Sequence, residues 1–168
     1  GLACQATSNV VTVTVNTITP QVIAANQTIS PNGDPVPFTV TTPSSFSGTA
    51  SYQWFVSTSS PNNGFSPING ETSSAYDAPP GLAITSYYQV ISTSTLNGIT
   101  CSATSNTLTV TVSAAPVVQN VNQTICSGTA FTVSPSNGGG NSVPAGTSYT
   151  WTVNNNPNVF GQSAQNSG

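Results

Sequence analysis

The sequence predicts an all-β protein made of tandem β-sandwich repeats, and three observations support this prediction. Val, Ile and Thr are abundant and aromatic residues are spaced along the chain, as suits half-buried strands. Thirteen Pro and fourteen Gly interrupt the chain often, and Met, a good helix former, is absent. Finally, long stretches recur with a period close to 97 residues, which is typical of a repeat protein.

Three landmarks define the repeat. The stretch ITCSATSNTLTVTV at 99–112 matches LACQATSNVVTVTV at 2–15 in nine of fourteen positions. Trp54 and Trp151 lie 97 residues apart, as do Cys4 and Cys101, whereas NQTIS at 26–30 and NQTIC at 122–126 are offset by 96. We therefore expect residues 1–15 to be the last strand of a preceding repeat, 16–113 a complete repeat, and 114–168 the first half of the following one.

Within the complete repeat, turn residues separate short runs with strand character. The expected strands are Gln21–Ile29, Phe38–Thr42, Ser51–Ser57, Ser73–Asp77, Ser86–Thr95 and 99–112, with a short edge strand inside 59–70. Asn97-Gly98 is a hairpin signal, because both residues tolerate the positive φ angles of a two-residue turn. About seven short strands with turns every 8–12 residues indicate a β-sandwich.

The closing strand alternates with a period of two. Leu108, Val110 and Val112 fall on one face, and Thr109 and Thr111 fall on the other. We expect the aliphatic face, Val110 and Val112 included, to pack into the sandwich and the Thr face to meet water. Residues 11–15 repeat this alternation.

The composition excludes several classes of function. Lys, Arg and His are absent, so neither nucleic acid nor an anionic membrane surface can be bound through positive charge. Nucleophilic catalysis that depends on His or Lys is excluded for the same reason. The only acids, Asp34, Glu71 and Asp77, are scattered. We expect no enzyme activity, no catalytic residue, no cofactor and no metal site. No apolar run approaches the roughly 20 residues of a spanning helix, so no membrane insertion is expected.

Two kinds of residue offer a contact or modification site. Phe55 and Phe65 are candidates for exposed ligand contacts, although isolated surface aromatics are common. Asn26 and Asn122 each begin an NQT triplet, which fits a glycosylation acceptor. A polar turn leading into a strand explains both triplets more simply, and we favour that interpretation.

Several motifs resemble immunoglobulin-like sandwiches. Trp54 resembles their core Trp, and TSYYQV at 85–90 resembles their tyrosine corner, with Tyr88 as the corner residue. Val90 stands where antibody domains carry Cys. NQTIC-SG, YDAPPGL and SYYQVISTSTLNGITCSATSN resemble the tandem immunoglobulin-like repeats of large secreted surface adhesins of Bacteroidetes. This resemblance implies a core position for Trp54, Tyr88 and Trp151, an extracellular, cell-surface location, type IX secretion and a link to gliding motility and cell adhesion.

The same resemblance implies a cysteine arrangement. Such repeats usually hold one Cys in the TIC motif and one after the hairpin, but the complete repeat has Ser30 at the first place. Cys101 and Cys126 are separated by a strand of about 36 Å, too long for a disulfide between them. We expect Cys4 and Cys126 to have partners outside this sequence. Cys101 should remain a free thiol facing Ser30, so that Ser30→Cys would form a bond with Cys101.

The architecture then suggests three functions. The leading hypothesis is a stalk or spacer in a repetitive adhesin, whose partners are the neighbouring repeats and, in transit, the secretion machinery. The alternatives are a recognition module for a surface glycan or protein, and a filament subunit that exchanges strands. The linker NTITPQ at 16–21 contains Pro and no Gly, so we expect limited hinging there.

Overall fold

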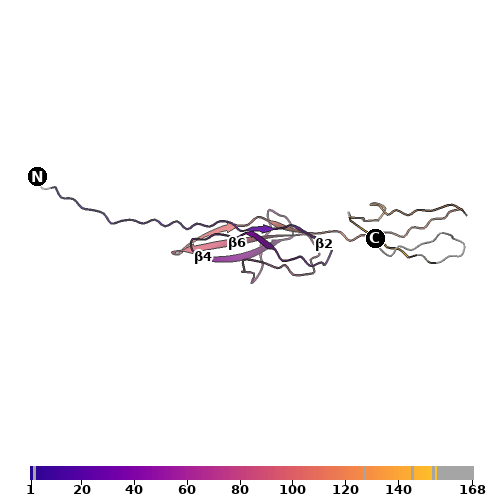
Figure 1. Ribbon diagram of the computed structural model, residues 1–168, viewed down its shortest axis with the longest axis horizontal. Coiled ribbons are helices and arrows are strands. Elements are labelled where there is room, and N and C mark those ends of the chain that lie inside the picture. The colour runs from indigo at the N-terminus through magenta and orange to yellow at the C-terminus, as the bar shows by residue number, and fades with distance from the viewer. Residues whose placement is uncertain (2, 127, 145, 153, 155–168) are drawn as a thin grey trace. The chain divides into compact units, whose positions relative to one another are not determined.

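The computed structural model describes residues 1, 3–126, 128–144, 146–152 and 154. The chain divides into two compact units, Gly1–Val112 and Ser113–Gly168 (Figure 1). Every regular element in the described residues is a β-strand, so the expected all-β fold class is confirmed. All of the named strands lie in the first unit, which is described first.

A six-stranded sheet forms the larger layer of unit 1. Its strand order is β2-β8-β6-β4-β5, with β7 also paired to β6. The bounds are β2 Gln27–Ile29, β4 Thr49–Ser57, β5 Ser66–Pro67, β6 Ser86–Leu96, β7 Ile99–Thr104 and β8 Leu108–Val112. The longest pairing joins β4 and β6 antiparallel, from Thr49 opposite Thr95 to Ser57 opposite Tyr87. The predicted strands 51–57 and 86–95 are thus present, and β5 is the short edge strand expected within 59–70.

A two-stranded sheet, β1 (Val22–Ala24) with β3 (Thr39–Thr42), forms the second layer. We expected one strand over Gln21–Ile29, and that prediction is wrong, because the segment breaks after Ala24. The chain changes sheets there: β1 pairs antiparallel with β3, whereas β2 pairs parallel with β8. The first part of the repeat therefore connects the two layers.

The hairpin between β6 and β7 matches its prediction. Asn97 and Gly98 both have positive φ, 50° and 79°, as a primed turn requires, and Leu96 pairs with Ile99. The closing strand, however, is interrupted after Thr104. There Ser105 donates its backbone N–H to the Val90 carbonyl, and its hydroxyl accepts the Val90 N–H. A side chain thereby replaces one backbone partner, which splits the strand into β7 and β8.

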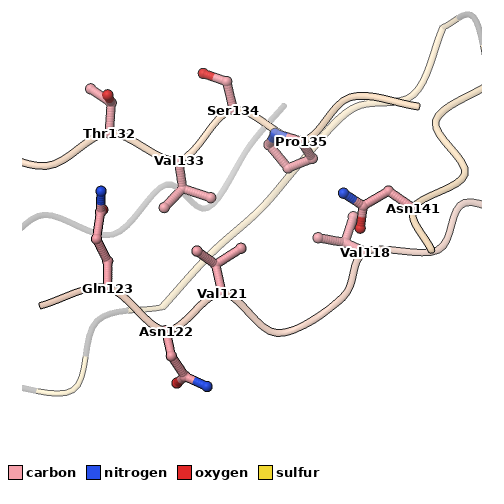
Figure 2. A pocket seen from close by; sticks show the side chains of 9 residues that line it. All are labelled: Val118, Val121, Asn122, Gln123, Thr132, Val133, Ser134, Pro135 and Asn141. Atoms are coloured by element: carbon pink, nitrogen blue, oxygen red, sulfur yellow. The ribbon is translucent and has the colours of Figure 1, made fainter. Parts of the chain in front are cut away.

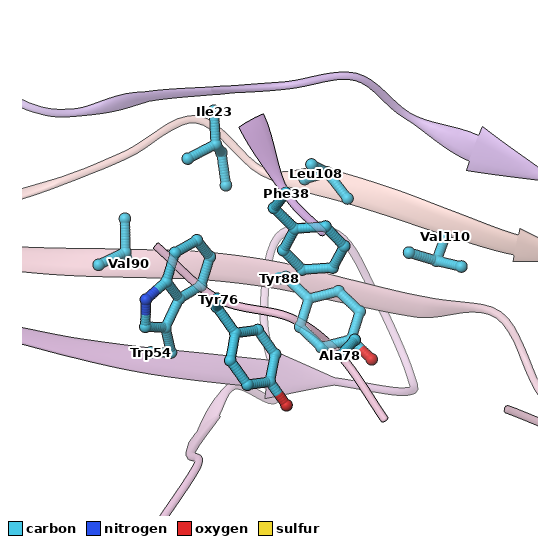
Figure 3. Close-up of a cluster of buried hydrophobic side chains, with 9 residues drawn as sticks. All are labelled: Ile23, Phe38, Trp54, Tyr76, Ala78, Tyr88, Val90, Leu108 and Val110. Atoms are coloured by element: carbon cyan, nitrogen blue, oxygen red, sulfur yellow. The ribbon is translucent and has the colours of Figure 1, made fainter. Parts of the chain in front are cut away.

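The core of unit 1 is a cluster of four aromatic rings between the layers (Figure 3). The centroid of Phe38 lies 4.9 Å from that of Tyr88, 5.8 Å from Tyr76 and 5.9 Å from Trp54. Trp54 is 0% exposed, and its indole N–H donates to the Ser73 carbonyl at 2.9 Å. Such tilted and edge-on contacts suit the quadrupoles of aromatic rings. The core position expected for Trp54 and Tyr88 is confirmed.

Tyr76 enters this core from a segment that is not a strand. We expected a strand over Ser73–Asp77, and that prediction is wrong, because the segment forms no strand. Its backbone bond to a neighbouring segment runs from the Phe38 N–H, just before β3, to the Tyr76 carbonyl. The segment instead lies against the Trp54 side chain, whose indole N–H donates to the Ser73 carbonyl. Within it Tyr76 is buried, while the neighbouring Ala75 and Asp77 are exposed.

The closing strand shows the expected alternation in part. Leu108 and Val110 are buried and Thr111 is exposed, whereas Thr109 and Val112 are both half-buried, so the core position expected for Val112 is wrong. At the other end of the unit, residues 3–15 run extended without a strand partner in the described part of the chain (Figure 1). Val11, Val13 and Val15 are 84%, 82% and 68% exposed, so the matching sequence does not pack as 108–112 does. The assignment of this segment to a preceding repeat stays a prediction.

Unit 2 has a sparser structure in its described residues. Its bridges include Val117–Ser142 and Gly138–Asn141, and Trp151 is also a bridge residue. Trp151 is 48% exposed and Phe131 is 56% exposed. The core position expected for Trp151 is therefore wrong for this chain. The rings that contact Trp54 in unit 1 are those of Phe38 and Tyr76.

Candidate functional site

The acidic residues do not gather into a site. Among the described residues, no three His, Cys, Asp or Glu side chains lie close enough to hold a metal ion. Asp34 and Asp77 are exposed and Glu71 is half-buried. The backbone carbonyl of Glu71, not its carboxylate, makes the recorded contact with Trp54. The chain therefore presents no acid pair held in a geometry for acid–base chemistry in its described part.

A pocket lies in unit 2, between the segment 118–123 and the segment 132–135 (Figure 2). Val118, Val121 and Val133 supply its apolar wall, and Val121 and Val133 point toward each other in the figure. Its polar lining consists of neutral side chains, among them Asn122, Gln123, Thr132, Ser134 and Asn141. The lining carries no charged side chain, and no acid or base among the lining residues stands beside the hydroxyls of Thr132 and Ser134 to activate them.

The residues proposed as contact or modification sites in unit 1 are partly buried or hydrogen-bonded within the sandwich. Phe55 is half-buried and lies between Pro67 of β5 and Gln89 of β6 in the sheet register, and Phe65 is also half-buried. Asn26 accepts the Thr109 N–H on its side-chain oxygen at 2.9 Å. The side chain of Asn26 thus joins β2 to β8, which supports the structural interpretation of the first NQT triplet.

None of the three cysteines forms a disulfide within the described residues: Cys4 and Cys126 are exposed, and Cys101 is half-buried. The partners expected outside this sequence for Cys4 and Cys126 stay a prediction. Cys101 does not face Ser30, so that expectation is wrong. Cys101 pairs opposite Ser94 on β6, whereas Ser30 follows Ile29, which pairs opposite Val112. Because β8 meets β6 at Ser86, the two places are separated by eight residues of β6, about 26 Å. A disulfide needs Cα atoms within about 7 Å, so Ser30→Cys cannot bond to Cys101.

The chain enters and leaves the sandwich of unit 1, residues 16–112, at opposite ends of the large sheet. At the entry end, the side chain of Asn16 donates to the carbonyls of Ser94 and Ile99, both at 2.8 Å, beside the hairpin turn. At the exit end, Val112 pairs with Ile29 and donates its N–H to the Thr85 hydroxyl. The composition alone did not reveal the role of Asn16, because its partners come from residues far along the chain.

Two side-chain amides fasten the first strands to the closing strand. Asn106 accepts the Ile23 N–H at 2.9 Å and donates to the Ile23 carbonyl at 2.8 Å. Asn26 adds its contact with Thr109 in the next segment. Because Ile23 is almost fully buried, Asn106 satisfies a backbone group that water does not reach. These contacts join the segment that contains β1 and β2 to the segment that contains β8.

The buried tyrosines titrate at high pH only. Burial raises the pKa of Tyr76 from 10.0 to about 12, and the charges of Tyr88, Glu71 and Asp77 add to this effect. Burial also raises the pKa of Tyr88, and a hydrogen bond with the Ser86 side chain partly offsets the increase. Both hydroxyls are therefore neutral at ordinary pH and act as parts of the core, not as acids or bases.

The fold and these contacts define an all-β protein whose described polar groups serve structure. Residues 19–114 match the family described as Domain of unknown function (DUF8696), so the chain belongs to that family. The matched region covers nearly the same residues as the repeat expected at 16–113. No curated protein and no solved structure matches the chain. The described residues include no helix with the length and apolar character needed to cross a membrane.

Proposed function

We propose that the chain is a stalk segment of a repetitive cell-surface adhesin, in which immunoglobulin-like units are joined end to end and hold a distal part away from the cell. The observation that carries this proposal is the position of the two ends of unit 1. The chain enters at Asn16, beside the Asn97-Gly98 turn, and leaves at Val112. Along the continuous strand β6, the pairing runs from Leu96 opposite Ile99 to Ser86 opposite Val110, ten residue steps or about 33 Å.

Entry and exit at opposite ends favour an extended array, because each unit adds its length to the chain. The strand order supports an immunoglobulin-like arrangement. The first segment contributes β1 to one sheet and β2, parallel to the last strand, to the other. The absence of positive side chains and the structural use of Asn16, Asn26 and Asn106 fit a spacer better than a binding site.

A spacer makes its contribution through length, and the test follows from that. In the parent surface protein, an unrelated rigid domain of equal length should replace residues 16–113 without loss of adhesion, whereas deletion of these residues should reduce it. Phe55→Ser and Phe65→Ser should leave adhesion unchanged. Specific binding of the 168-residue chain to a glycan, abolished by either Phe substitution, would replace the spacer proposal by a recognition module.

One observation favours a second function, assembly by strand exchange. Residues 3–15 have strand composition, yet their Val side chains are exposed and their backbone is unpaired in the described structure. Such a segment is a template for pairing with another sheet. If exchange occurs, the 168-residue chain should form dimers or longer species whose mass falls to that of a monomer when residues 1–15 are removed. A monomer at high concentration would eliminate this alternative.

A further inference from the structure

We propose that Asn16 locks the joint at which the chain enters unit 1, so that the connection to whatever precedes it is rigid from this residue onward. The inference rests on the proposed end-to-end array for its biological meaning, but its physical basis lies within unit 1. The Asn16 side chain would thus fix the direction in which the chain approaches the end of the large sheet at the Asn97-Gly98 turn.

The Asn16 side chain makes every hydrogen bond that an amide can make. Its two N–H donors bind the carbonyls of Ser94 and Ile99, each at 2.8 Å. Its oxygen accepts from the hydroxyl of Ser94 at 2.7 Å and from that of Ser47 at 3.1 Å. An amide has two donors and two acceptor lone pairs, so all four positions are used. The contacts come from both strands of the β6–β7 hairpin and from the loop before β4.

The partners of Asn16 are themselves fixed. Ser94 is 0% exposed, and its hydroxyl accepts the Gly48 N–H at 3.0 Å while it donates to Asn16. A Cβ atom at Gly48 would overlap the Thr95 carbonyl, so only glycine allows the loop to approach β6 this closely. Ser94 and Gly48 therefore form a close-packed inner side of the socket for Asn16, whereas Ser47 and Ile99 contribute from the exposed side.

The residues after Asn16 continue the attachment. Ser47 N–H donates to the Thr17 carbonyl at 3.1 Å, and Thr17 N–H donates to the Ser47 hydroxyl at 2.6 Å. Thr19 N–H donates to the Ser45 carbonyl, and the two hydroxyls of Thr19 and Ser45 lie 2.8 Å apart. The segment expected to act as a linker with limited hinging is thus bound to unit 1 over its first four residues.

This attachment leaves almost no length for a flexible linker. Val15 matches Val112, the last residue of β8, in the repeat pattern. If residues 1–15 close a preceding repeat, one peptide bond separates its last strand residue from the locked Asn16.

The test measures local order in the intact 168-residue chain by ¹⁵N relaxation of backbone amides. In the unmodified chain, the Asn16 and Thr17 amides should show order parameters near 0.85, as in β4, and the values should fall below about 0.6 further toward residue 3. In Asn16→Ala, the values at 15–17 should fall to about 0.6 or below, while those of β4 and β6 stay unchanged. Asn9→Ala, an exposed asparagine on the preceding segment, should change none of them.

Two further variants keep the test decisive. Ser47→Ala removes one partner of Asn16 from an exposed position, so the chain should remain folded even if Asn16→Ala does not, and it should lower the order of residues 16 and 17 to a smaller extent. Unchanged order in Asn16→Ala, or low order at Asn16 in the unmodified chain, would overturn the lock. Neither result concerns adhesion, so the spacer proposal is tested separately by the domain replacement.

Discussion

Units 1 and 2 contain the same aromatic landmarks in very different surroundings. Trp54 and Phe38 are 0% and 3% exposed, whereas Trp151 and Phe131, in matching motifs, are 48% and 56% exposed. The local sequences SYQW and SYTW are nearly identical. The difference shows that the motif places a Trp on the chain, but later segments bury it. In unit 1 a later segment supplies Tyr76, whose ring contacts both Trp54 and Tyr88.

The unit 2 pocket shows the same difference at its aliphatic residues. Val118, Val121 and Val133 line an open pocket between two segments (Figure 2). In unit 1, by contrast, Ile23 and Phe38 from the first segments are covered by Leu108 and Val110 of the closing strand (Figure 3). Burial of apolar surface, which stabilises a fold by roughly 25 cal/mol per Å², is thus concentrated in unit 1.

The largest effect that would sharpen this comparison is expected from the two Trp residues. Trp54→Ala should destabilise unit 1 by about 3–5 kcal/mol, because it leaves a cavity among Phe38, Tyr76 and Val90. That is a large share of the roughly 5–15 kcal/mol that stabilises an ordinary domain. Urea denaturation followed by far-ultraviolet circular dichroism measures the loss.

Trp151→Ala is the matched control, with the same substitution at the corresponding motif position. Because the Trp151 side chain is half exposed, its removal should change the free energy of unfolding by no more than about 0.5 kcal/mol, as at most surface positions. Equal losses for the two variants would contradict the comparison, since they would mean that unit 2 encloses its Trp as tightly as unit 1 does.

The next effect concerns Asn106, which bridges the closing strand to the first strand. Asn106→Ala removes both hydrogen bonds to the backbone of Ile23 and leaves a nearly buried N–H and carbonyl without this partner. We expect a loss of about 1–3 kcal/mol in the free energy of unfolding. Asn9 occupies the same place in the repeat pattern but is exposed on the unpaired segment, so Asn9→Ala should change nothing.

These residues also show which features the sequence could predict. The Asn97-Gly98 turn and the alternation at 108–110 were predictable, because each depends on neighbours in the chain. The break between β1 and β2, the interruption at Ser105 and the separation of Ser30 from Cys101 were not. Each depends on a partner more than ten residues away, such as Val90 for Ser105 or Val112 for Ile29. Asn16 belongs to this second group, since Ser94 lies 78 positions away.

A smaller effect is expected at the NQT triplets. Asn26→Ala removes the acceptor for the Thr109 N–H between β2 and β8, and should cost about 0.5–1.5 kcal/mol, a typical net value for one hydrogen bond. Asn122→Ala changes the matching residue in unit 2, where the side chain is exposed at the rim of a pocket, and should be neutral. Chemical denaturation of both variants measures the difference. A costly Asn122→Ala would show that the second triplet has the same structural role as the first.

The smallest effect is expected from pH between 6 and 8, where stability should stay nearly constant because the chain has no His. Above this range, the ionisation of the buried Tyr76 should determine how the stability of unit 1 changes with pH. The pKa of Tyr76 is raised by burial to about 12 in the folded chain, so between about pH 10 and 12 the unfolded chain releases its proton first. The folded state then binds more protons than the unfolded state, and stability falls as pH rises. The contribution of Tyr76 is complete below pH 10 and is lost as pH passes through its folded pKa.

Melting temperatures at pH 7, 9, 10.5 and 11.5 should be level and then decline. Tyr76→Phe, which keeps the ring against Phe38, should make that decline shallower. A decline that begins below pH 9, or a slope that Tyr76→Phe leaves unchanged, would show that another group controls the alkaline stability of unit 1.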